Sequence, residues 1–120
     1  LLCWFLNQKK NSQIFGFKNH LWNGITTRHF GKIISILILK KIKIPNTLHI
    51  IPKKIVNKFE LLKIFQNKFN RHDLTITQTN ASIIVDRTLK SNYMDVNKKI
   101  NKALGLKKSP SIKQMINEII

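Results

Sequence analysis

The segment Asn57-Lys58-Phe59-Glu60-Leu61-Leu62, followed by Leu74-Thr75-Ile76-Thr77-Gln78, decides the fold class of this chain. Asn57 is a typical N-cap residue, because its side-chain oxygen can accept a hydrogen bond from an amide of the first helical turn. Helical spacing places apolar side chains on one side of the expected helix, at Phe59, Leu62, Ile64, Phe65 and Phe69. The alternation in 74–78 predicts a strand. A helix followed directly by a strand indicates an α/β fold.

Working outward, turn signals divide the rest of the chain into further short elements. Strands are expected at 13–17 and 47–51, and helices at 1–6, from Thr26 or Thr27 to about Lys41, at about 96–104 with Gly105 as C-cap, and from about Ser109. Trp22-Asn23-Gly24 is expected to form a turn, because Asn-Gly readily adopts positive φ. We found no internal repeat and no linker, so we expect one compact α/β piece.

The helix expected after Thr26 carries the most apolar stretch of the chain. Its apolar side chains follow the three-four spacing of a buried stripe, at Phe30, Ile33, Ile34, Leu37 and Ile38. The run 33–39 is much shorter than the roughly 20 apolar residues of a spanning helix. We therefore expect a helix in the protein core, a cytoplasmic protein and no membrane partner.

The charge is strongly positive: 22 Lys and Arg against 5 Asp and Glu, a formal net charge of +17. Only three of the 22 are Arg, and the lysines are scattered in ones and twos among many Asn and Ile residues. Such a composition is typical of codon drift in an AT-rich genome, whereas a phosphate-tracking surface usually has clustered Arg and interleaved aromatics. We expect weak, salt-sensitive association with polyanions and no specific nucleic-acid partner.

The residue inventory contains no catalytic apparatus. The single cysteine, Cys3, excludes an internal disulfide, and the four histidines lack the spacing of a metal site. The glycines form neither a dinucleotide fingerprint nor a P-loop. The only tyrosine, Tyr93, is followed four residues later by Asn97 and not by lysine. From the residues alone, catalytic and metal-binding residues are therefore expected to be absent.

Three groups of segments nevertheless occur in a recognisable order. They are Leu1–Leu6 with Gly16–Asn19 and Trp22–Thr27; Leu48–Pro52 with Asn57–Leu62; and Val85-Asp86-Arg87-Thr88-Leu89 with Lys108–Ser111 and Met115-Ile116. This order resembles the C-terminal part of dTDP-4-dehydrorhamnose reductase-type proteins, in the extended short-chain dehydrogenase/reductase superfamily. The resemblance extends over nearly the whole chain.

The resemblance implies the C-terminal, nucleotide-sugar-binding part (residues 1–120) of an extended Rossmann-type fold. The parent enzyme would transfer a hydride from NAD(P)H to a keto-sugar nucleotide, reducing or epimerising it for surface polysaccharide synthesis. The Gly-rich turn and the Tyr-x-x-x-Lys pair of that family would lie upstream of Leu1, in an NAD(P)-binding portion that is missing here. This chain alone is therefore expected to be inactive and to bind no NAD(P)H.

Within that resemblance, the substrate-binding residues are expected to be Trp22, Asn23, Gly24, Thr26 and Arg87. The loop 22–27 would offer an indole face, an amide and the backbone amides of a helix start, and Arg87 would pair with the diphosphate. Bland alternatives stay open: an edge aromatic for Trp22, a simple turn for Asn23-Gly24, and a local ion pair with Asp86 for Arg87.

Two other functional classes remain open. One is a small basic RNA- or ribosome-associated protein without enzymatic activity, favoured by the net charge. The other is a non-enzymatic regulatory subunit on the same fold, because a fold does not determine an activity.

Overall fold

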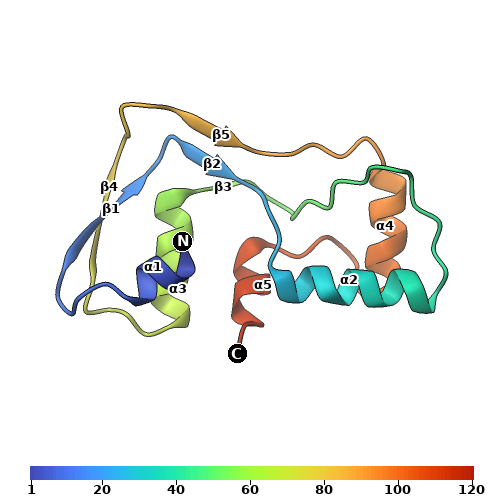
Figure 1. Cartoon of the computed structure of the whole chain (residues 1–120), viewed down its shortest axis with the longest axis horizontal. Coiled ribbons are helices and arrows are strands. Elements are labelled where there is room, and N and C mark those ends of the chain that lie inside the picture. The colour runs from blue at the N-terminus through green and yellow to red at the C-terminus, as the bar shows by residue number, and fades with distance from the viewer. The chain divides into compact units, whose positions relative to one another are not determined.

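The computed structural model describes all residues, 1–120, and has a mixed α/β fold (Figure 1). In place of the single compact piece expected from the sequence, the chain forms two compact units. The first unit contains residues 1–22 and 55–87, and the second contains 23–54 and 88–120. Each unit is therefore assembled from two separate stretches of the sequence.

The first unit holds all the strands. It comprises α1 (Leu2–Leu6), β1 (Gln13–Phe17), β2 (His20–Trp22), β3 (Val56–Asn57), α3 (Lys58–Lys68), β4 (Thr75–Thr79) and β5 (Val85–Arg87). Strand β1 pairs in parallel with β4, and β2 lies between antiparallel β3 and parallel β5. The expected helices at 1–6 and after Asn57, and the strands at 13–17 and 74–78, are confirmed. Strands β2, β3 and β5 were not expected.

Helix α3 packs against β1 and β4, and α1 lies beside it (Figure 1). Asn57 caps α3 in a capping box: its Oδ1 accepts from the Glu60 amide at 2.8 Å, and Glu60 accepts from the Asn57 amide at 2.9 Å. The rings of Phe5 and Phe65 lie 5.7 Å apart and join α1 to α3. Gly16 permits the close approach of β1 to α3, because a Cβ there would lie 2.6 Å from the Cα of Phe59.

The second unit contains helices α2 (Thr27–Leu39), α4 (Met94–Ala103) and α5 (Ile112–Asn117), joined by irregular segments. Thr26 and Ser111 are the N-caps of α2 and α5, and Gly105, with φ of +75°, follows the end of α4. An ion pair of 2.6 Å between Lys32 and Glu118 links α2 to α5. The apolar side chains buried in the core of this unit are Ile33, Ile100, Ile112, Met115 and Ile116.

The expectation that α2 is a buried core helix is wrong. Ile33 is buried, but Phe30 is 51% exposed and Ile38 is 70% exposed. Helix α4 packs against α2 and covers only part of the apolar stripe, so the rest of the stripe is exposed. No helix of the chain has the combination of length and apolar character that crossing a membrane requires.

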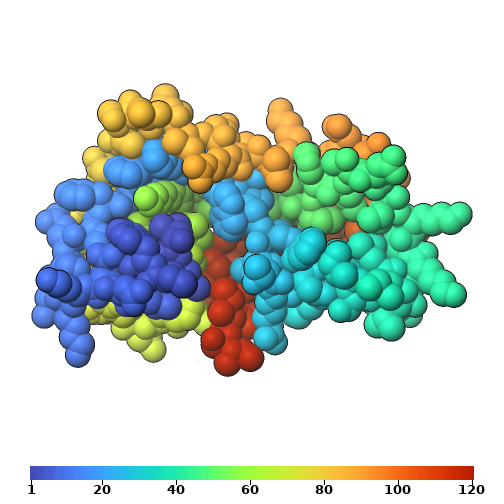
Figure 2. Space-filling view, in the orientation of Figure 1, coloured from blue at the N-terminus to red at the C-terminus, as the bar shows by residue number.

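The expectation of a strand at 47–51 is also wrong, because this segment is irregular. Its polar groups bind to the segment after β5 and to α4, and not to a neighbouring strand. His49 Nδ1 lies 2.9 Å from the carbonyl oxygen of Lys90, and the His49 carbonyl accepts from Asn97 Nδ2 at 3.3 Å. Figure 2 shows the two segments, green and orange, side by side.

The turn expected at Trp22-Asn23-Gly24 does not form. Trp22 ends β2, and neither Asn23 nor Gly24 has positive φ. The chain turns earlier, at Lys18-Asn19, and runs from β2 without a tight turn to the N-cap of α2. Helix α5 begins at Ile112 with Ser111 as its N-cap residue, slightly later than the start expected at about Ser109.

Candidate functional site

The structure brings together two of the expected substrate residues, Trp22 and Arg87. They are directly paired positions of the parallel strands β2 and β5, and Trp22 is paired on its other side with Val56 of β3. Paired positions project to the same face of a sheet. Val56, Trp22 and Arg87 therefore form a row of an aliphatic, an aromatic and a cationic side chain across one face.

Asp86 and Arg87 are successive residues of β5. Successive residues of a strand point to opposite faces. Asp86 is paired with Leu21 and so lies on the face opposite to Trp22 and Arg87. The Arg87 side chain is exposed, and Trp22 is half-buried.

The other three expected residues belong to the second unit, and two of them have clear structural roles. Asn23 is 4% exposed, and its Nδ2 donates to the Leu89 carbonyl at 2.7 Å while its Oδ1 accepts from the Leu89 amide at 2.7 Å. Thr26 caps α2, its Oγ1 accepting from the His29 amide at 3.2 Å. Gly24 is half-buried in the segment that joins these two residues.

His29 is the buried titratable group of the second unit. It is 3% exposed, and burial is the main cause that lowers its pKa below 6.5. The negative charge of Glu118 raises the pKa of His29 and the positive charge of Lys32 lowers it, both to a smaller extent. No group of three His, Cys, Asp or Glu side chains in the chain is arranged to hold a metal ion.

The structure also shows a pocket that the sequence analysis missed. Its volume is about 810 Å³, and it lies within the second unit between segment 51–53, helix α4 and segment 105–109. Five lysines line it, together with Asn97 and Asn101, and no carboxylate does. The sequence signal was the repeat of Asn97-Lys98 at Asn101-Lys102, which places like residues one turn apart on one helix face.

The comparisons with known proteins do not identify a family. No protein-family model, no curated protein and no solved structure matches this chain.

Proposed function

We propose that this chain is the nucleotide-sugar-binding part of an NAD(P)-dependent sugar-nucleotide oxidoreductase, the C-terminal portion of an extended Rossmann-type fold. The observation that carries the proposal is the direct pairing of Trp22 with Arg87 across β2 and β5. The resemblance in sequence order to dTDP-4-dehydrorhamnose reductase-type proteins also supports it. Both residues stand among the substrate contacts expected from that resemblance.

The pairing supports this function because a nucleotide sugar has two kinds of group to recognise. Its base and sugar rings offer flat or apolar faces on which an indole can pack. Its diphosphate offers anionic oxygens, which a planar guanidinium can bind in a two-pronged arrangement. Neighbouring strands lie only about 4.8 Å apart, so one ligand can contact both side chains.

In this proposal the residues of the chain bind and orient the substrate, and they do not carry out the hydride transfer. The reduced nicotinamide would supply the hydride when bound by the Gly-rich portion of the parent enzyme. Orientation by Trp22 and Arg87 would hold the keto group in place for that step. The isolated chain should therefore bind a nucleotide sugar without oxidising NADPH.

Calorimetric titration of the 120-residue chain with dTDP-glucose tests the proposal. Arg87→Lys keeps the charge but loses the planar fork, so affinity should fall by about 1–3 kcal/mol, roughly fivefold to 150-fold. Arg28→Lys is the matched control, because Arg28 is exposed on α2 in the second unit. Equal affinities of Arg87→Lys and the wild type, with both folded, would remove Arg87 from the site.

The polyanion-binding alternative is favoured by the formal charge of +17. It predicts RNA binding that weakens steeply with salt and responds equally to the loss of any lysine. Titration with a short RNA at 50 and 200 mM salt, beside the dTDP-glucose titration, separates the two functions. Tight RNA binding without any nucleotide-sugar binding would favour the alternative.

A further inference from the structure

The pocket of the second unit is a built structure in which three segments are fastened to one another. The Lys53 amide donates to the Pro110 carbonyl at 3.1 Å, which fixes segment 51–53 beside the chain that precedes α5. Asn101 Nδ2 donates to Ser109 Oγ at 3.0 Å, which fixes segment 105–109 against α4. The pocket walls are therefore held before any ligand arrives.

The last carbonyls of α4 are paired within the chain. A helix C-terminus normally presents unsatisfied carbonyls and a partial negative charge. Here the Leu106 amide donates to the Asn101 carbonyl at 2.8 Å, and the Gly105 amide donates to the Lys102 carbonyl at 3.0 Å. This Schellman arrangement, made possible by the positive φ of Gly105, satisfies those carbonyls and turns the chain back along the pocket.

The charge of the lining is uniformly positive. The lysines of the pocket lining are Lys53, Lys98, Lys102, Lys107 and Lys108. All five are exposed side chains, and no Asp or Glu belongs to the lining. Like charges that are gathered in one concave surface repel one another and attract an anion of multiple charge.

Asn97 is the one buried polar side chain of the pocket lining. Asn97 is 5% exposed and lines the pocket, and its Oδ1 has no hydrogen-bond partner. Its Nδ2, in contrast, donates to Ser91 Oγ at 2.7 Å. The Oδ1 atom itself has no accessible surface, so the role of Asn97 in the pocket is structural: its amide nitrogen holds Ser91 and the His49 carbonyl beside α4.

The size and the apolar part of the lining narrow the ligand further. A volume of about 810 Å³ falls in the usual range for small-molecule sites. Apolar side chains form the rest of the wall, at Ile51, Pro52, Met94 and Leu106. We infer that this pocket binds a small molecule that carries a diphosphate and a ring, with the lysines on the phosphates and the apolar wall against the ring.

NMR titration of the ¹⁵N-labelled 120-residue chain with ADP and with inorganic pyrophosphate tests this inference, because amide shifts locate the bound ligand. We expect saturable shifts at Asn97, Asn101 and Gly105 with both probes, and ADP at least fivefold tighter because only ADP has a ring. Shifts confined to Trp22 and Arg87 would overturn the inference and leave the proposed function intact. Shifts at the pocket and none at Trp22 and Arg87 would support the inference, and the dTDP-glucose titration would still decide the proposed function.

Two double variants of equal charge separate a site from general attraction. Lys98→Ala/Lys102→Ala should weaken ADP binding at least tenfold. Lys99→Ala/Lys113→Ala removes the same charge from residues outside the pocket lining and should change it less than twofold. Equal weakening by both double variants, or equal affinity for ADP and a short RNA per phosphate, would overturn the inference. The same chemical-shift maps would report whether both variants are folded.

Discussion

The side-chain amide of Asn23 binds the backbone of Leu89 at both of its polar groups, with two hydrogen bonds of 2.7 Å. An equivalent pair occurs in the first unit, where Asn19 Nδ2 donates to the Ala81 carbonyl at 2.7 Å and Asn19 Oδ1 accepts from the Ala81 amide at 2.9 Å. In both cases an asparagine amide takes the place of a peptide group of a strand. It thus satisfies backbone groups of a segment that is distant in the sequence.

Replacing Asn23 with alanine should therefore lower the free energy of unfolding by about 1–3 kcal/mol, because a backbone donor and an acceptor of Leu89 lose their partner. Urea denaturation followed by circular dichroism measures the change. Asn46→Ala is the control, because Asn46 is exposed in an irregular segment of the same unit. A stability for Asn23→Ala equal to that of Asn46→Ala would show that water replaces the amide at no cost.

The substitutions Gly16→Ala and Gly31→Ala should change the stability of the chain in opposite directions. Alanine at Gly16 would place its Cβ 2.6 Å from the Cα of Phe59, so β1 and α3 must separate. We expect Gly16→Ala to lose about 1–3 kcal/mol of stability, as overpacking typically does. Gly31→Ala, in open space on α2, should gain about 0.5–1 kcal/mol from helix propensity. Melting temperatures of both variants check the direction of each change. A wild-type melting temperature for Gly16→Ala would mean that α3 moves away from β1 at no cost in stability.

Local sequence signals predicted much of the fold. The helix starts at Thr26 and Asn57 and the turn at Gly105 depend on hydrogen bonds or φ angles within a few residues, so the sequence is sufficient to identify them. The expectations of a strand at 47–51 and of a buried α2 were wrong for a different reason. An apolar run predicts burial or pairing only when a partner surface exists elsewhere in the chain, and the sequence does not state how much surface the other elements offer.

For the candidate site too, the sequence predicts single residues but not the contacts between distant segments that bring them together. Trp22 and Arg87 were each expected from the resemblance, but their direct pairing depends on the register of β2 and β5, which lie far apart in the sequence. The pocket lysines looked scattered because Lys53 is distant from α4 along the chain. The segment before α5 brings them together through the Lys53–Pro110 hydrogen bond, for which no local pattern exists.

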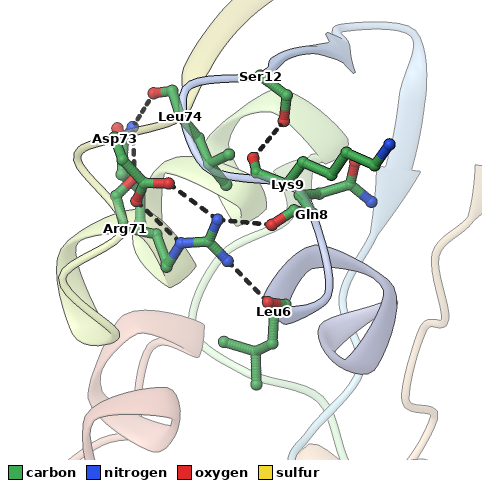
Figure 3. A network of polar contacts seen from close by, with 8 residues as sticks. Leu6, Gln8, Lys9, Ser12, Arg71, Asp73 and Leu74 are labelled. Carbon is green, nitrogen blue, oxygen red and sulfur yellow. Dashed lines mark hydrogen bonds and ion pairs between the residues drawn. The ribbon is translucent and has the colours of Figure 1, made fainter.

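Arg71 joins α1 to the turn before β4, as Figure 3 shows. Its guanidinium donates to the carbonyls of Leu6 and Gln8 at 2.7 and 2.8 Å and makes two hydrogen bonds of 2.9 Å to Asp73. Lysine cannot make four such bonds, so Arg71→Lys should lower the urea midpoint and speed amide exchange in α1. Hydrogen exchange read by NMR checks this, with exposed Lys63→Arg as control. Unchanged exchange in α1 would contradict it.

The contact between Arg71 and Asp73 also makes the free energy of unfolding depend on pH in the acid range. Hydrogen bonding to Arg71 is the main cause that lowers the pKa of Asp73 below 3.8. The contribution of the Asp73 charge is therefore complete above about pH 4 and is lost as the pH falls through the lower pKa of the folded state. Asp73→Asn should flatten the loss of stability below pH 4, measured by urea midpoints at pH 5 and pH 3. An unchanged slope would mean that Asp73 titrates alike in both states.

His29 should produce a second pH dependence, near neutrality. Because burial lowers its pKa in the folded state, the folded and unfolded chains are both neutral at this residue above pH 6.5. As the pH falls below 6.5, the unfolded chain takes up a proton first, so the free energy of unfolding decreases until the pH passes the folded pKa. Glu118 opposes this shift and stays charged throughout, since its own pKa is lowered by Lys32.

Melting temperatures of the wild type and His29→Gln at pH 7.5 and pH 5.5 isolate this contribution. The wild type should lose stability over this interval, and His29→Gln should lose less, because glutamine takes up no proton in either state. His72→Gln, at an exposed position, should keep the wild-type difference. If His29→Gln and the wild type lost the same amount, a buried neutral imidazole at position 29 would not explain the effect. In that case His29 would take up the proton within the folded second unit, where the negative charge of Glu118 favours the imidazolium.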